Sequence, residues 1–241
     1  AYRAGARLVD VVYNDEQILL QRFNHAPRDS FDEYPYWVPQ LIKEILENGD
    51  ALIAFSADDP DLLKGQDPGL VGTYLKTRMN HIRRYQDALM VNASNWLVVA
   101  YPIPVWAAKV FPHLPADEAL AKLWRAVAKA CRLDLDDPVA AWKEHDRQLH
   151  ARRELLTRKQ YTALQYRAPG TDLTVGLPQG HRWMGGHATS ANGINFIPNL
   201  PTEEVFTLPH KDRVEGTVRA SLPLSYQGAL IENFDLVYQD G

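Results

Sequence analysis

Apolar and polar positions in the first two thirds of the chain switch between strand-like and helix-like patterns. Short runs of β-branched and other apolar residues are typical of buried strands; they occupy residues 7–13, 51–55 and 96–101. Apolar residues at the spacing of one helical face are typical of packed helices; they cover residues 35–48, 68–89, 115–132 and 138–158. Alternating strands and helices predict an α/β domain with a parallel sheet, which we place at residues 1–158.

The pattern changes after Gln160. Short strand-like runs separated by Pro- and Gly-rich turns predict a β-rich second part; they lie at residues 163–167, 172–176, 217–222 and 234–238. We therefore place a β-rich (α+β) domain at residues 159–241. Because the chain begins without Met and stops at Asp240–Gly241, a dipeptide favoured in hairpin turns, we expect this second domain to be incomplete in the chain.

Composition and charge narrow the classes of function. A net charge of −4 argues against a general nucleic-acid binder, which usually carries a basic patch. No apolar run approaches the roughly 18 residues of a membrane span, so we expect no membrane partner. The one cysteine, Cys131, falls on the apolar stripe of the helix predicted at 115–132, which favours a buried core residue over a reactive thiol. A single cysteine also indicates a reducing compartment, and we expect the cytoplasm.

The histidines form no recognisable metal motif in the sequence. His145 and His150 share a predicted helix, but five residues apart they do not face the same way. His181 and His187 flank Trp183 and a double glycine in a predicted turn. These two are candidate ligands, although turn histidines that are solvated or locally bonded are more common.

Two adjacent carboxylates, Glu203 and Glu204, offer the most informative chemistry. They lie between turn residues and a β-type run within Asn199–Thr207. Neighbouring side chains of an extended segment point to opposite faces, so one of the pair at most can serve a given site. A carboxylate at the mouth of a strand suits a hard or borderline divalent ion. The alternative is an acidic turn exposed to water.

The segment Asn199–Thr207 resembles the Asn-x-Pro-Thr-Glu-Glu-Val-Phe-Thr motif of the aminopeptidase T / aminopeptidase S / PepS family. Further segments resemble that family in the same order, and together the similarity covers essentially all 241 residues. These segments are Asp59–Gly65, Trp106–Pro112, Asp137–Trp142, Ala168–Leu173 and Val218–Ser221. Leu208, beside the motif, stands where family members often have Ala.

The resemblance implies a metal-dependent aminopeptidase in which Glu204, the second glutamate of the motif, is a metal ligand. It further implies two divalent ions (cobalt, zinc or magnesium) that activate water for attack on a peptide with a free N-terminus, and a homodimer. The remaining ligands belong to later segments of the family, and the family's first strand–helix unit also has no counterpart here. The alternative is a binding or assembly module that keeps the scaffold without catalysis.

Overall fold

A computed structural model describes residues 1–226 and 229–241, in which most helices precede most strands. The helices are α1 (Glu16–His25), α2 (Trp37–Asn48), α3 (Pro68–Met90), α4 (Pro104–Val110), α5 (Ala116–Ala130) and α6 (Pro138–Lys159), with short 3-10 helices at Tyr2–Ala4 and Arg28–Asp32. The strands are β1 (Leu52–Ser56), β2 (Trp96–Ala100), β3 (Ala163–Ala168), β4 (Thr171–Gly176), β5 (Ala188–Thr189), β6 (Asn195–Phe196), β7 (Asn199–Leu200), β8 (Val214–Arg219), β9 (Leu224–Tyr226), β10 (Ala229–Ile231) and β11 (Asp235–Tyr238).

The parallel sheet contains three strands in the order β1-β2-β7. Its central strand, β2, pairs in parallel with β1 along five residues and with β7 along two. β7 follows residue 159, so strands from both sides of the predicted boundary at 158/159 pair in one sheet. The boundary itself remains a prediction.

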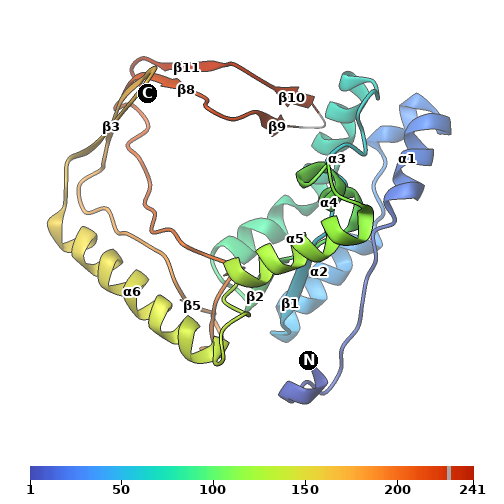
Figure 1. Cartoon of the computed structure of the whole chain (residues 1–241), viewed down its shortest axis with the longest axis horizontal. Helices are drawn as coiled ribbons and strands as arrows, with labels where there is room; N and C mark the ends of the chain where they lie inside the picture. The colour runs from blue at the N-terminus through green and yellow to red at the C-terminus, as the bar shows by residue number, and fades with distance from the viewer. Residues whose placement is uncertain (227–228) are drawn as a thin grey trace.

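Antiparallel pairing dominates the last third of the chain. Four strands form a sheet in the order β11-β8-β4-β3, and two short hairpin pairs are formed by β5 with β6 and by β9 with β10. The fold is therefore mixed α/β, with a parallel sheet and antiparallel sheets, which confirms that part of the predicted fold class. Helix α6 extends from the region of the parallel sheet to that of the four-stranded sheet (Figure 1).

Several predicted segments differ from the structure. The strand predicted at residues 7–13 is wrong, because the segment has no strand partner and remains exposed, with Leu8 82% exposed. β-branched residues favour a strand, but a strand forms only where another strand is available to pair with it. The strand predicted at 217–222 begins earlier, at Val214, where its pairing with β4 starts. Helices α1 and α4 were not predicted.

Capping residues explain where three helices begin. The Asp137 carboxylate accepts a hydrogen bond of 2.9 Å from the Ala140 N–H, and Pro138 occupies the first turn of α6. Asp67 caps α3 in the same way through the Leu70 N–H, and Asp15 caps α1. The start of α6, on which the site below depends, is thus specified locally by the sequence.

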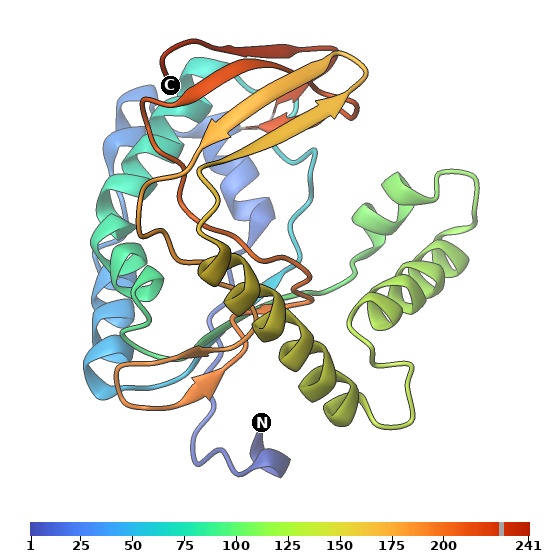
Figure 2. The same ribbon diagram turned by 90° about the vertical axis from the view of Figure 1, so that its left-hand side faces the viewer.

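Two separate clusters of buried apolar side chains hold helices together, and further buried side chains, such as Trp142 and Leu149, lie on α6. Phe23, Phe31, Leu70 and Val71 pack α1 and the following 3-10 helix against α3, while Ala107, Ala119 and Leu123 pack α4 against α5. Figure 2 shows α2 and α3 on the left of the view and α4 and α5 on the right. Between them, β1 is largely exposed, with Phe55 64% exposed. Among the described residues, no helix is long and apolar enough to span a membrane.

Cys131 follows α5 and is 1% exposed, which confirms its prediction as a core residue. Burial raises the pKa of its thiol. Its backbone carbonyl accepts a 2.7 Å hydrogen bond from the Trp142 indole on α6. This contact joins α5 and α6 beside the candidate site.

Candidate metal centre

The acidic segment begins where β7 leaves the parallel sheet. The Leu200–Pro201 peptide bond is cis, and Thr202 is buried. His145 of α6 donates a hydrogen bond of 2.8 Å from Nε2 to the carbonyl oxygen of Thr202. One turn of α6 therefore holds the backbone immediately before the two glutamates.

Glu203 is neutralised by a neighbouring cation. Its two carboxylate oxygens accept hydrogen bonds of 2.7 and 3.2 Å from the Arg132 guanidinium, and His145 Nε2 lies 3.4 Å away. The hydrogen bond from Arg132 holds the pKa of Glu203 below its ordinary value. Arg132 in turn stacks over the Trp142 ring at 4.9 Å, which fixes the guanidinium in place.

Glu204 has different surroundings. Its side chain is exposed, and its Oε2 accepts a 3.0 Å hydrogen bond from the Glu203 backbone N–H. Within the part of the chain that the structure describes, no salt bridge involves Glu204, whereas Glu203 pairs with Arg132. Adjacent carboxylates thus face different environments, as expected for an extended segment. The assignment of Glu204 as a metal ligand remains a prediction.

A glycine turn supports the backbone of Glu204. Met184 and Phe206 exchange backbone hydrogen bonds of 2.8 and 2.9 Å, which brings Gly185 against the glutamate segment. A Cβ at Gly185 would lie 2.6 Å from the Glu204 carbonyl oxygen, and the glycine has φ of +144°. A residue with a side chain would therefore push directly on the backbone of Glu204.

The adjoining side of this turn carries a second cluster: Asp146, His150 and His187. The Asp146 carboxylate accepts two hydrogen bonds of 2.7 Å from His187, one from its backbone N–H and one from Nδ1. His150 Nδ1 lies 3.3 Å from Asp146 Oδ1, and the two imidazole rings stack with centroids 4.0 Å apart. Among the described residues, this is the one group of three His, Cys, Asp or Glu whose ligand atoms lie within 4.8 Å of one another.

The electrostatics of Asp146 favour a carboxylate rather than a carboxylic acid. Partial burial alone would raise the pKa of Asp146, but hydrogen bonds from His187 and the proximity of His150 outweigh it. The net result is a pKa below the ordinary value. The Asp146 carboxyl is therefore anionic at neutral pH and can attract a cation.

Sequence reasoning found part of this arrangement. His145 and His150 belong to different contacts, as their spacing predicts, and His181 bonds locally through Nδ1 to the Pro178 carbonyl oxygen. Asp146 was missed. The available signal was its separation of four residues from His150, which places both on one helix face, whereas the approach of His187 requires the tertiary fold.

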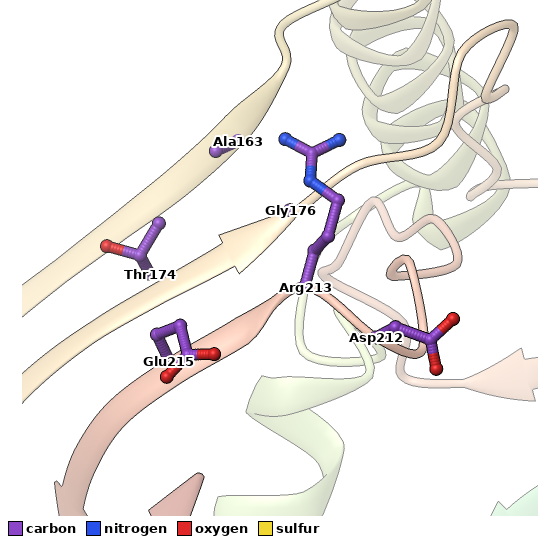
Figure 3. Close-up of a pocket in the computed structure, with 6 residues that line it drawn as sticks. All are labelled: Ala163, Thr174, Gly176, Asp212, Arg213 and Glu215. Atoms are coloured by element: carbon purple, nitrogen blue, oxygen red, sulfur yellow. The ribbon is translucent and has the colours of Figure 1, made fainter. Parts of the chain in front are cut away.

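A separate hollow of about 230 Å³ lies on the antiparallel sheet. Figure 3 shows Arg213 extending past Gly176 toward Ala163, while Asp212 points away. The guanidinium donates to two backbone carbonyl oxygens, at 3.3 and 3.4 Å, and the Glu215 carboxylate accepts from the Asp240 N–H. Arg213 and Glu215 thus make hydrogen bonds to backbone groups around the antiparallel sheet, so we assign no function to this hollow.

The chain thus has a mixed α/β fold that carries two groups of side chains suited to divalent ions: the acidic segment at the parallel sheet and the neighbouring His/Asp cluster. A family model described as thermophilic metalloprotease (M29) matches residues 1–241. The chain therefore belongs to the thermophilic metalloprotease (M29) family.

Comparisons with individual proteins agree. The chain is 45% identical over 241 residues to Aminopeptidase 2 of Geobacillus stearothermophilus, covering 100% of this chain and 58% of that protein. It is 41% identical to Aminopeptidase T of Thermus thermophilus, covering 100% and 59% respectively. The solved structure of wild-type AmpT from Thermus thermophilus superimposes with a TM-score of 0.91 at 40% identity, covering 100% of this chain and 59% of that one. The chain thus spans less than two thirds of the length of these relatives.

Proposed function

We propose that the protein carrying this chain is a metal-dependent aminopeptidase, which releases amino acids from peptides with a free N-terminus, and that Glu204 binds one of two divalent ions. Cobalt, zinc and magnesium are the candidate ions. The family and the aminopeptidase names of the relatives support the reaction. Both side chains are exposed, and the observation that carries the assignment is that Glu203 is ion-paired with Arg132 while no salt bridge involves Glu204 among the described residues.

The contrast matters because a dication must compete with any cation already on the carboxylate. Binding to Glu203 would require displacement of Arg132, whose two hydrogen bonds form an ion pair worth up to about 1 kcal/mol at this exposed position. Binding to Glu204 would require the loss of one backbone hydrogen bond to the adjacent residue. The side chain of Glu204 is thus the more available ligand of the two.

The described residues supply an incomplete ligand set around Glu204, because the one compact His/Asp group does not include it. Divalent ions in such a site would supply Lewis-acid activation of the scissile carbonyl and of water. The contribution of this chain would be one anionic ligand and the backbone contacts that hold it. We therefore also propose that the 241-residue chain has little or no peptidase activity alone.

The test compares Glu204→Gln with Glu203→Gln in the complete protein, using hydrolysis of an amino-acid anilide at saturating metal. Glu204→Gln keeps the shape but removes a negative ligand, so we expect kcat/KM to fall by a factor of several hundred or more, where each 1.36 kcal/mol is about tenfold. Glu203→Gln is the matched control and should cost far less. Near-normal activity of Glu204→Gln would contradict the assignment. A wild-type protein that binds peptides without cleaving them would instead support the binding-module alternative.

A homodimer remains a prediction from the family resemblance, as does a cytoplasmic location. For the dimer, light scattering on the complete protein at micromolar concentration should give twice the monomer mass. A monomer mass under those conditions would count against it.

A further inference from the structure

We propose that Asp146, His150 and His187 bind a divalent transition-metal ion at a site separate from the one assigned to Glu204. The three side chains come from two segments, α6 and the turn that follows Gly186, and their ligand atoms lie within 4.8 Å of one another. The compact group they form does not include Glu204.

The donor set matches this class of ion. Two imidazoles and one carboxylate suit Zn²⁺ and related first-row ions, whereas calcium and magnesium prefer sites built from oxygen alone. For bonds of about 2.0–2.1 Å in a tetrahedral site, neighbouring ligand atoms are roughly 3.3 Å apart. The distance from Asp146 Oδ1 to His150 Nδ1 is 3.3 Å.

Both imidazoles must rearrange to bind an ion. His150 Nδ1 donates a 3.1 Å hydrogen bond to the Asp146 backbone carbonyl oxygen, so that nitrogen has to give up its proton. His187 Nδ1 is 2.7 Å from Asp146 Oδ2, which is the length of a hydrogen bond. An ion bound through that nitrogen would replace its proton and move the two atoms apart, and the released proton would pass to solvent. The backbone N–H of His187 keeps its own 2.7 Å bond to Asp146 Oδ1, so the residue remains tethered while its ring adjusts.

Gly186 packs directly on this cluster. A Cβ there would lie 2.5 Å from Asp146 Oδ1 and 3.0 Å from His150 Nδ1, so the ligand atoms can lie this close to the turn only because the residue has no side chain. The side chains of His150, Asp146 and His187 are 18%, 20% and 35% exposed. They are partly shielded from water, and His187 leaves a path by which an ion and a solvent ligand can enter.

A bound ion would fasten α6 to the turn at residues 184–187. Met184 in that turn pairs with Phe206, and Gly185 contacts the backbone of Glu204. The ion would therefore act as a structural clamp beside the acidic segment. This role does not depend on peptidase activity.

The test counts ions bound by the complete protein after removal of metal with a chelator and titration with Zn²⁺ alone. We expect His150→Gln and His187→Gln each to bind one Zn²⁺ fewer per chain than wild type. Their affinity for that ion should fall by roughly 100-fold or more, since even residues that only support a ligand change affinity 10–100-fold. The matched control is His113→Gln, an exposed histidine outside this group, which should bind as many ions as wild type. Glu204→Gln should keep this ion even if it loses activity and another ion.

A second measurement needs no variant. Because His187 is partly exposed, diethyl pyrocarbonate should modify it in the metal-free protein, and Zn²⁺ should protect it, as read by mass spectrometry of peptides. Absence of protection, or equal zinc counts for His150→Gln and His113→Gln, would overturn the proposal and leave a hydrogen-bonded cluster. Loss of the same ion in Glu204→Gln would also overturn it, because the ion would then belong to the site of the proposed function.

Discussion

Replacement of Gly186 by Ala tests whether the close approach between the glycine turn and α6 is needed for stability. Gly186 has φ of +71°, where a side chain costs about 1–2 kcal/mol. Its Cβ would also lie 2.5 Å from Asp146 Oδ1, which would have to move and lose its bond from the His187 backbone N–H. A hydrogen bond to a charged group contributes about 1.5–3 kcal/mol. The expected total loss is therefore roughly 2.5–5 kcal/mol in the free energy of unfolding.

Gly180→Ala is the matched control. Gly180 has nearly the same backbone angle, φ of +75°, but no atom lies within 4 Å of its Cβ position. It should lose only the backbone term of about 1–2 kcal/mol. The assay is urea denaturation of wild type and both variants in metal-free buffer, followed by far-UV circular dichroism and tryptophan fluorescence. Equal losses for the two variants would refute the contact between Gly186 and Asp146 as a source of stability.

Three substitutions test other parts of the fold by the same assay. Phe31→Ala should lower the free energy of unfolding by about 3–5 kcal/mol, because Phe31 is 0% exposed and its ring lies 4.9 Å from that of Phe23. The control is Phe55→Ala, which should cost much less because Phe55 is 64% exposed. Similar losses for the two variants would contradict the location of the core. Glu203→Gln should lose up to about 1 kcal/mol near pH 7, discounted because Glu203 is 58% exposed. Because the pKa of Glu203 is lower in the folded state, its ionisation stabilises the folded protein at pH values above the unfolded pKa of about 4.3. The difference in the free energy of unfolding between wild type and Glu203→Gln should therefore vanish as the pH falls through the folded pKa. A difference that stays constant with pH would contradict the ion pair.

Local patterns predicted most elements because their signals lie within a few residues. The capping Asp137 and the following Pro138 marked the start of α6, and the apolar stripe that includes Cys131 placed that residue in the core. The strand predicted at residues 7–13 failed because pairing depends on a partner that the residues themselves do not specify. The exposed face of Phe55 shows the same dependence, since the pattern indicates a strand but not what covers it.

In the candidate site, too, the local features could be predicted from the sequence and the long-range contacts could not. Alternation in an extended segment predicts that Glu203 and Glu204 face different surroundings, but only the fold reveals that Arg132 pairs with Glu203. The proximity of Asp146 and His150 follows from helical spacing alone. The contact between His187 and Asp146, 41 residues apart in the sequence, depends on the tertiary fold, and no local pattern predicts it.

The path of the chain also explains how a segment with little regular structure keeps a defined position. Helix α6 and its C-cap residue contact residues 181–202 at three points along the helix: Gln160 bonds to His181, Thr157 to Trp183 and His145 to Thr202. Each of these bonds occupies a backbone group that would otherwise be left to solvent. Because the helix is a single rigid element, all of these contacts are fixed relative to one another.

His145 of α6 restrains the backbone just before Glu204, and the Met184–Phe206 hydrogen bonds restrain the backbone just after it. Arg132, which lies between α5 and α6, pairs with the neighbouring Glu203. The side chain of Glu204 is left exposed, with one hydrogen bond from the adjacent backbone. A ligand held in the way we propose for Glu204 would lose little backbone freedom on binding an ion, since the ordering has already occurred during folding. Its carboxylate would also not have to give up a cation first. On this proposal the two adjacent glutamates have different roles: Glu203 anchors the segment through its pair with Arg132, and Glu204 binds the ion.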